Sequence, residues 1–197
     1  MNIFILRHGE TELNNKGIIQ GSDIDSEINK KGIIQSNKFY EKYKKYPFQK
    51  IYISNLKRTY QSILKFIHLG IPYEKLESLN EISWGKNQGK KDDIIDYKKL
   101  IDSWSKGNLN DSFTNGESPL DVKNRQEHFI KKIIEDNFEN ILVCTHGRAL
   151  RIMLSWLLNN NISKMNNYPH SNLGLYVLKF KNKIFRMIKK NDISHLS

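Results

Sequence analysis

The chain has 197 residues, of which 38% are hydrophobic and 27% charged. This composition is typical of a globular protein and excludes a disordered one, and no apolar run approaches the ~20 residues that span a bilayer. The formal net charge of +11 suggests nucleic-acid binding, but the lysines are spread along the whole chain and no nucleic-acid-binding motif is present. The charge therefore favours small anionic substrates over nucleic acid.

Cysteine usage and the N-terminal residues both favour a cytoplasmic location. Cys144 is the single cysteine, so no internal disulfide can form, and it lies in an apolar run that is typical of a buried, inert thiol. The N-terminus enters an apolar segment at once, without the basic region of a secretory signal.

The first third of the chain predicts a strand, a long polar segment and a helix. Residues 2–6 form a continuous apolar run that is typical of a buried parallel strand. Residues 7–29 are polar and too long for a simple connection, which indicates a functional segment. Residues 31–46 are predicted to form a helix that ends before Pro47. The apolar face expected for this helix consists of Ile33, Ile34, Phe39 and Tyr43.

The middle of the chain predicts two more strands, a helix and an insertion. Strands are expected at 50–53 and 73–79, with a helix at 56–69 between them that is stopped by Gly70. Residues 82–117 are irregular, apart from a short helix near 92–105, and resemble an inserted lid. Its aromatic residues are expected either to pack the lid or to line a specificity pocket; they are Trp84, Trp104 and Phe113.

The last third predicts two helices, a strand and a hairpin. Ser118 and Pro119 suit the N-cap and first position of a helix that runs to about residue 138. A strand at 141–145, a helix at 149–158 and a hairpin at 173–188 follow. Strands that alternate with helices predict an α/β fold with helices on both faces of the sheet, and residues 1–197 are expected to form one domain.

Two histidines follow apolar strands that are far apart in the sequence. Arg7 and His8 end the first strand, and His146 follows the strand at 141–145. Because parallel strands end at the same edge of a sheet, the two histidines are expected to meet there, and Arg58 could reach the same edge. An imidazole can act as a nucleophile, and guanidinium groups bind phosphoryl oxygens without a metal ion.

A leaving alkoxide would need a proton, and Glu81, after the strand expected at 73–79, is the carboxyl group best placed to supply it. Glu117 is the alternative acid, although its position before a helix also suits a structural role. Arg125 is expected to pair with a carboxylate, and His170 could contact a substrate at the rim.

Several ordered motifs together resemble the histidine phosphatase superfamily, and more closely its phosphoglycerate mutase-like branch. The resemblance covers nearly the whole chain. The motifs are Leu6-Arg7-His8-Gly9-Glu10-Thr11 with Asn14, Gln20-Gly21, Lys31-Gly32, Leu56-Lys57-Arg58-Thr59, Leu79-Asn80-Glu81 with Gly85, Gly116-Glu117-Ser118 with Arg125, and Thr145-His146-Gly147.

The resemblance implies a three-layer α/β/α sandwich on a mostly parallel sheet, and an enzyme that needs neither metal nor cofactor. His8 would attack phosphorus and become phosphohistidine, and Glu81 would protonate the leaving group and then activate water. The phosphoryl oxygens would be held by Arg7, Arg58 and His146, with additional donors from Asn14 and the backbone of Gly147.

Departures from the family pattern favour a phosphatase over a mutase. The chain has Ile82-Ser83-Trp84-Gly85 where the mutases often have Arg-His-Tyr-Gly, and its lid is shorter. A cofactor-dependent phosphoglycerate mutase and an inactive phospho-ligand-binding protein remain the alternatives. The expected partner is a small phosphorylated substrate, with no nucleic acid or membrane; the particular ester and the oligomeric state are left open.

Overall fold

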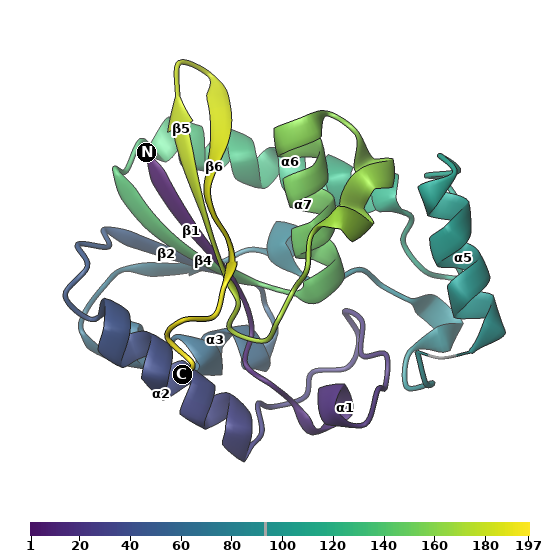
Figure 1. The fold of residues 1–197 in the computed structure, drawn as a ribbon, viewed down its shortest axis with the longest axis horizontal. Helices are drawn as coiled ribbons and strands as arrows, with labels where there is room; N and C mark the ends of the chain where they lie inside the picture. The colour runs from purple at the N-terminus through teal and green to yellow at the C-terminus, as the bar shows by residue number, and fades with distance from the viewer. Residues whose placement is uncertain (93) are drawn as a thin grey trace.

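The computed structural model describes residues 1–92 and 94–197, which form α-helices around a six-stranded sheet (Figure 1). The strand order is β3-β2-β4-β1-β5-β6. The strands are β1 (Asn2–Arg7), β2 (Lys50–Ile53), β3 (Tyr73–Lys75), β4 (Asn140–Thr145), β5 (Leu175–Lys181) and β6 (Ile184–Asp192). The pairings among β1, β2, β3 and β4 are parallel, whereas β5 is antiparallel to both of its neighbours. The mostly parallel sheet is therefore confirmed.

The described residues form several helices, some of which cover the two faces of this sheet. They are α1 (Glu12–Asn15), α2 (Lys30–Tyr43), α3 (Lys57–Ser62), α4 (Leu64–His68), α5 (Ile95–Ser105), α6 (Pro119–Asp136) and α7 (Gly147–Asn159). Three 3-10 turns complete the description: η1 (Glu77–Leu79), η2 (Gly85–Asn87) and η3 (Ile162–Asn167). Figure 1 shows α6 and α7 on one side of the strands and α2 and α3 on the other, which confirms the three-layer sandwich.

The central strands are apolar on both faces because each face is covered. In β1, Ile3 and Ile5 pack in a cluster with residues of α6 and α7. Phe4 and Leu6 point to the opposite face and pack with residues of α2 and α4. This alternation explains why the strand reads as a continuous apolar run. Cys144 of β4 is buried in the second cluster, as predicted.

Helix α6 begins at the predicted signal. The Ser118 hydroxyl accepts a hydrogen bond from the Asp121 backbone N–H (3.2 Å), and the Asp121 carboxylate accepts one from the Ser118 N–H (2.9 Å). Pro119 occupies the first helical position, where its missing N–H costs nothing. The helix ends at Asn137, which adopts a left-handed conformation with φ 53°.

The single helix expected at 56–69 is two helices, because the chain breaks at Ile63, whose φ and ψ are −126° and 14°. The Ser62 carbonyl accepts a hydrogen bond from the Ser36 hydroxyl of α2. The strand expected at 73–79 was also too long. Its partner β2 ends at Ile53, so β3 stops at Lys75 and a 3-10 turn follows.

The predicted apolar face of α2 is confirmed for Phe39 and Tyr43, which pack in the core, and wrong for Ile33 and Ile34, which are 50% and 57% exposed. The buried residues of α2 are Gly32 and Phe39. A Cβ atom at Gly32 would lie 2.3 Å from the Glu10 carbonyl oxygen, so the absence of a side chain lets the helix approach this loop closely. That approach fixes the rotation of α2 and leaves the two isoleucines on its outer side.

We expect Phe39→Ala to destabilise the protein strongly, because Phe39 fills the core between α2 and the sheet. The substitution should lower the free energy of unfolding by about 3–5 kcal/mol, measured by urea denaturation. Ile34→Ala on the exposed side of the same helix is the control and should change it by less than about 0.5 kcal/mol. Equal effects of the two substitutions would contradict the orientation of α2.

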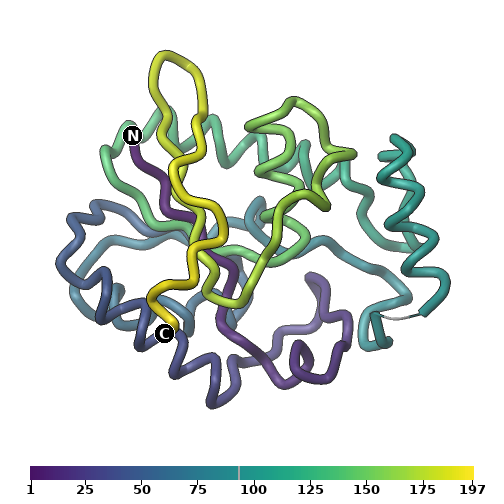
Figure 2. The backbone as a smooth tube through the Cα atoms, in the orientation of Figure 1, coloured from purple at the N-terminus to yellow at the C-terminus, as the bar shows by residue number. Residues whose placement is uncertain are grey.

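The described part of the expected lid, residues 82–92 and 94–117, packs at one end of the molecule, where Figure 2 shows α5 beside neighbouring loops. The rings of Trp84 and Trp104 stack with centroids 5.6 Å apart, and Phe113 lies 6.2 Å from Trp84. The Trp104 indole N–H donates to the Asp111 carbonyl (2.8 Å). These aromatic residues therefore hold the lid together, in one hydrophobic cluster that also contains Ile152 of α7.

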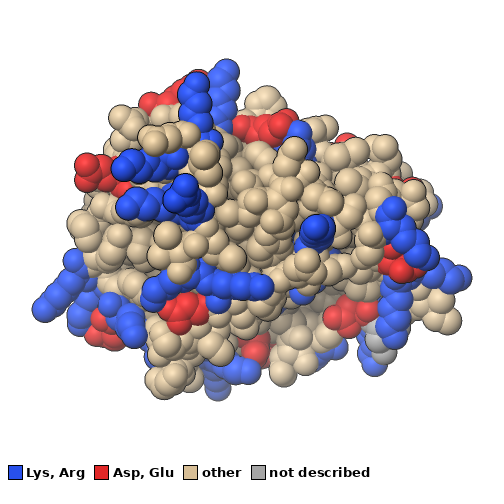
Figure 3. Space-filling view, turned by 45° about the horizontal axis from the view of Figure 1, so that its top comes forward, with Lys and Arg blue, Asp and Glu red and all other residues tan. Residues whose placement is uncertain are grey.

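Basic residues occur in several separate places on the face shown in Figure 3, with acidic residues among them. On this face the distribution agrees with a general lysine bias rather than a single basic groove. None of the helices in the described part of the chain is long and apolar enough to cross a membrane.

Candidate active site

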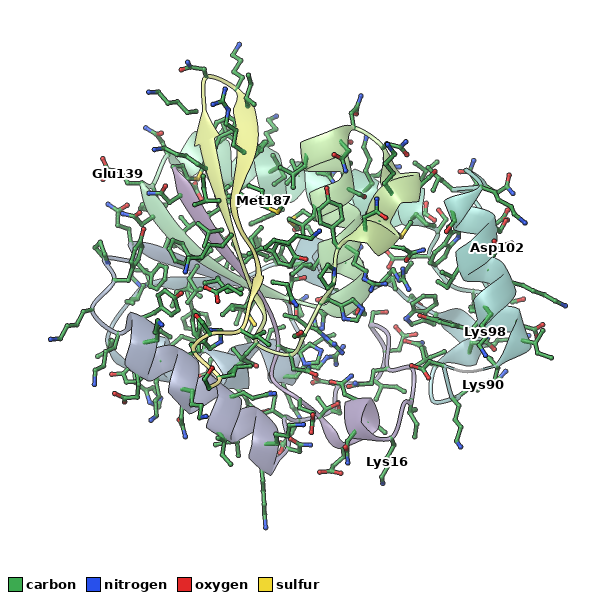
Figure 4. The ribbon with its side chains drawn as sticks, in the orientation of Figure 1. Lys16, Lys90, Lys98, Asp102, Glu139 and Met187 are labelled. Carbon is green, nitrogen blue, oxygen red and sulfur yellow. The ribbon has the colours of Figure 1, made fainter. Side chains whose placement is uncertain are left out.

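A cavity of about 120 Å³ lies beyond the carboxyl ends of β1 and β4. Six of the seven predicted site residues line it, namely Arg7, His8, Asn14, Arg58, Glu81 and Gly147. Figure 4 shows nitrogen-bearing side chains gathered between α7 and the segment around α1, whereas the labelled Lys16 and Lys90 lie at the periphery. The topology thus brings together segments that are far apart in the sequence.

His8 is held in the orientation that a nucleophile requires. Its Nδ1 atom is 2.7 Å from the Gly9 carbonyl oxygen, which can only accept, so Nδ1 carries the proton. The Nε2 atom then bears the lone pair, and the side chain is only 3% exposed. Burial, and the positive charges of Arg58 and Arg7, lower the pKa of His8 well below its usual value. The imidazole is therefore neutral at pH 7 and able to attack phosphorus.

Arg7 ends strand β1 and is fixed by His170. Its Nη1 atom donates to His170 Nδ1 (3.0 Å) and to the His170 carbonyl oxygen (2.8 Å). The buried Nε atom has no hydrogen-bond partner among the described residues. Burial lowers the pKa of Arg7, and burial followed by the charge of Arg7 lowers the pKa of His170 to about 3. Arg7 lines the cavity with a buried guanidinium that has no carboxylate partner among the described residues, so an anion bound in the cavity would be favoured.

Arg58 of α3 is fully buried and is held by three hydrogen bonds. Its Nη1 and Nη2 atoms donate to the carbonyl oxygens of Ile24 (2.7 Å) and Gly21 (2.8 Å), and Nε donates to His146 Nδ1 (3.1 Å). Burial lowers its pKa to about 10, so the group stays charged at pH 7. Two of its five N–H groups remain for a ligand.

His146 lies beside His8, with ring centroids 5.1 Å apart, but both of its ring nitrogens already have protein partners. Nδ1 accepts from Arg58, so Nε2 carries the proton and donates to the Ser54 hydroxyl (2.8 Å). His146 is absent from the residues that line the cavity. Its observed role is to orient Arg58, and its contact with a phosphoryl oxygen stays a prediction.

Glu81 is oriented by backbone N–H groups, two of which belong to the first turn of α7. Oε1 accepts from Ala149 (2.8 Å) and from Ile82 (3.0 Å), and Oε2 accepts from Arg148 (3.1 Å). Arg125 supports the segment through a bond to the Glu81 carbonyl oxygen (3.1 Å).

The alternative acid, Glu117, instead forms an ion pair with Arg125, with 2.8 Å between Oε1 and Nε. It does not line the cavity. The pairing predicted for Arg125 is thus confirmed, and of the two candidate glutamates only Glu81 lines the cavity.

Two further donors face the cavity. The Oδ1 atom of Asn14 accepts from Asn172 Nδ2 and from the Thr11 N–H, both at 3.3 Å, which leaves Asn14 Nδ2 for a ligand. Gly147 is the first residue of α7, and its N–H has no acceptor among the described residues. A helix N-terminus with a free N–H favours an anion.

Sequence reasoning missed some residues of the cavity wall, namely Gln20, Tyr97 and Arg148, and it placed His170 only at the rim. Arg148 directly follows the His146-Gly147 motif, and this position in the sequence could have identified it as a residue of the site. Trp84 also lines the cavity, so it both packs the lid and faces the site. Among the described residues, no group of three or more His, Cys, Asp or Glu side chains is placed to hold a metal ion.

Comparison with known proteins gives matches over nearly the whole chain. The family model described as histidine phosphatase superfamily (branch 1) matches residues 3–193. The chain is 24% identical over 196 residues to a protein named putative phosphoserine phosphatase 2 from Hydrogenobacter thermophilus, covering 98% of this chain and 96% of that protein.

Two further matches differ in how much of the other protein they cover. One is 6-phosphofructo-2-kinase/fructose-2,6-bisphosphatase from Aquarana catesbeiana, 29% identical over 171 residues, which are 83% of this chain and 34% of that protein. The chain thus spans about a third of this relative. The other is the crystal structure of phosphoserine phosphatase from Entamoeba histolytica in complex with 3-phosphoglyceric acid. It superposes with a TM-score of 0.86 at 24% identity, covering 100% of this chain and 99% of that chain, which shows the shared fold.

Proposed function

The chain belongs to branch 1 of the histidine phosphatase superfamily, and we propose that it hydrolyses small phosphomonoesters through a phosphohistidine at His8, without a metal ion. The observation that carries this proposal is the neutral His8, which lines a cavity that Arg7 and Arg58 also line and whose Nε2 is left unprotonated by the hydrogen bond from Nδ1 to Gly9. The reaction also needs a proton donor for the leaving group. Glu81, which lines the same cavity, is the carboxyl group assigned to this role.

In the first step, His8 Nε2 attacks phosphorus and the bond from phosphorus to the ester oxygen breaks. A protonated Glu81 gives its proton to that oxygen, so the alcohol leaves neutral. Arg7 and Arg58 balance the charge on the phosphoryl oxygens, and the Gly147 N–H and Asn14 Nδ2 add neutral donors.

In the second step, Glu81 takes a proton from water as the water oxygen attacks the phosphohistidine. The nitrogen–phosphorus bond breaks, inorganic phosphate forms, and His8 regains its lone pair. His146 acts as a positioning residue through its bond to Arg58 Nε.

The related proteins support a phosphatase acting on small metabolites, but their names give different substrates: phosphoserine in one case and fructose 2,6-bisphosphate in another. The cavity of about 120 Å³ suits a small ester. We also propose a cytoplasmic location, which a single buried thiol supports and which cell fractionation would test.

We expect release of phosphate from 4-nitrophenyl phosphate to continue unchanged in excess EDTA, because guanidinium groups supply the charge that a metal would otherwise provide. A malachite-green assay before and after chelation measures this. Loss of activity on chelation would contradict the metal-independent mechanism. Interconversion of 3- and 2-phosphoglycerate that exceeds hydrolysis and depends on 2,3-bisphosphoglycerate would establish a mutase instead.

A further inference from the structure

A third guanidinium group lies on the wall of the cavity and takes no part in the mechanism above. Arg148 is the second residue of α7, its side chain is 7% exposed, and it lines the same cavity as His8. Its backbone N–H binds Glu81, so the side chain is anchored directly beside the proton donor.

The protein partners of this guanidinium are all neutral. Nη1 donates to Asn166 Oδ1 (2.9 Å), and Nη2 donates to the Tyr97 hydroxyl (3.1 Å). The group also lies over the rings of Trp84 and Trp104, with its central carbon 5.9 and 5.6 Å from their centroids. Within residues 1–92 and 94–197, no carboxylate forms an ion pair with Arg148. A buried charge without an opposite charge is costly, so a ligand anion here would be strongly favoured.

The charges on the cavity wall indicate which anionic group of a substrate Arg148 would bind. A bound phosphoryl dianion is balanced by Arg7 and Arg58, which leaves the single positive charge of Arg148. A carboxylate supplies one negative charge, whereas a second phosphate would bring close to two. The carboxylate of Asp92 also lines the cavity and offsets part of the positive charge of its wall, so a monoanion is favoured over a second dianion.

The geometry of Arg148 also suits a carboxylate. Tyr97 of the lid and Asn166 of η3 fix the plane of the guanidinium and use two of its five N–H groups. Three N–H groups remain, and a fixed guanidinium fork can bind the two oxygens of a carboxylate together.

We propose that Arg148 binds a carboxylate on the substrate, and that the preferred substrates are therefore small phosphomonoesters that also carry a carboxylate. This proposal rests on the proposed phosphatase function. It also gives Tyr97 and Trp84 of the lid a role in specificity, because they hold the guanidinium in place.

Two matched pairs of esters test the proposal. 3-Phosphoglycerate is compared with glycerol 3-phosphate, and O-phosphoserine with phosphoethanolamine, since the members of each pair differ mainly in the carboxylate. We expect kcat/KM of the wild-type protein to be about 10- to 100-fold higher for the carboxylate member of at least one pair. Arg148→Met should reduce this ratio by about tenfold or more, and Arg148→Lys by less.

Arg151→Met is the matched control. Arg151 lies one turn along α7, also donates to neutral partners, Tyr168 O and Asn166 Oδ1, and does not line the cavity. Arg151→Met should leave the ratio of kcat/KM values for the two esters of a pair within about twofold of the wild-type ratio. Thermal unfolding of each variant reports whether it folds, and the Lys variant keeps the test available if the Met variant does not.

Hydrolysis of both pairs without preference, or a ratio that Arg148→Met and Arg148→Lys leave unchanged, would overturn the carboxylate assignment. So would a strong preference for fructose 2,6-bisphosphate over fructose 6-phosphate that disappears in Arg148→Met, because this would assign a second phosphate to the site. Failure of every ester to be hydrolysed would instead reject the proposed phosphatase function.

Discussion

Replacing His8 by alanine is expected to reduce phosphate release by about 10⁴-fold or more, because the substitution removes the nucleophile while it leaves the two arginines in place. Among the described residues, the His8 ring forms a hydrogen bond only with its neighbour Gly9, so little of the fold depends on it. Initial rates with 4-nitrophenyl phosphate measure the effect.

Trapping of the intermediate tests the covalent step directly. Acid-labile, base-stable phosphate on the protein is expected after rapid quenching of the wild type and not of His8→Ala. His128→Ala, on the exposed side of α6, is the control and should keep both activity and label. Full activity of His8→Ala, or a label that persists in it, would refute the proposed intermediate.

For Glu81→Gln, we expect a loss that depends on the leaving group. With an alkyl phosphate, kcat should fall by about 10²- to 10⁴-fold, because the leaving alkoxide no longer receives a proton. With 4-nitrophenyl phosphate, formation of the phosphohistidine should be much less affected, because nitrophenolate leaves without protonation. Single-turnover measurements of nitrophenol release separate this step from the later attack of water.

Glu117→Gln provides the control, because Glu117 is the competing carboxylate from the sequence. It should lower stability through loss of the ion pair with Arg125 but show no dependence on the leaving group. If Glu117→Gln shows that dependence and Glu81→Gln does not, the assignment of the proton donor is wrong.

The central strands of the sheet, and the edge of the sheet at which the site lies, could be predicted because both depend on local sequence patterns. Strands β1 and β4 are buried on both faces, so each is a continuous apolar run, and the residues that follow such strands meet at one edge. The start of α6 was predictable for a similar reason, since Ser118 and Pro119 carry the cap within the local sequence.

Features that depend on distant partners could not be predicted. The break at Ile63 and the rotation of α2 are set by contacts between α2 and other segments, from Ser36 to Ser62 and from Gly32 to Glu10. The hydrophobic pattern predicted that Ile33 lies in the core. It could not show that Gly32 lets α2 approach the loop at Glu10, because a glycine contributes no apolar signal to such a pattern.

The role of His146 illustrates the same limit within the site. Its position after β4 was predicted, but its hydrogen bonds to Arg58 and Ser54 depend on how α3 packs beside the sheet. The role of Arg148 could not be predicted, because it depends on the neutral groups that bind its guanidinium. These groups, Tyr97 and Asn166, come from two separate segments of the chain.

The two halves of the site are joined by adjacent strands rather than by loops. Arg7 is in register with Thr145, and the His8 N–H donates to the Thr145 carbonyl oxygen (3.0 Å). The spacing between nucleophile and partner histidine is therefore set by two buried, hydrogen-bonded strands, whose amides are expected to exchange slowly. Heat inactivation should consequently follow amide exchange of β1 and β4, so that residual activity after heating reports the integrity of the core as a whole.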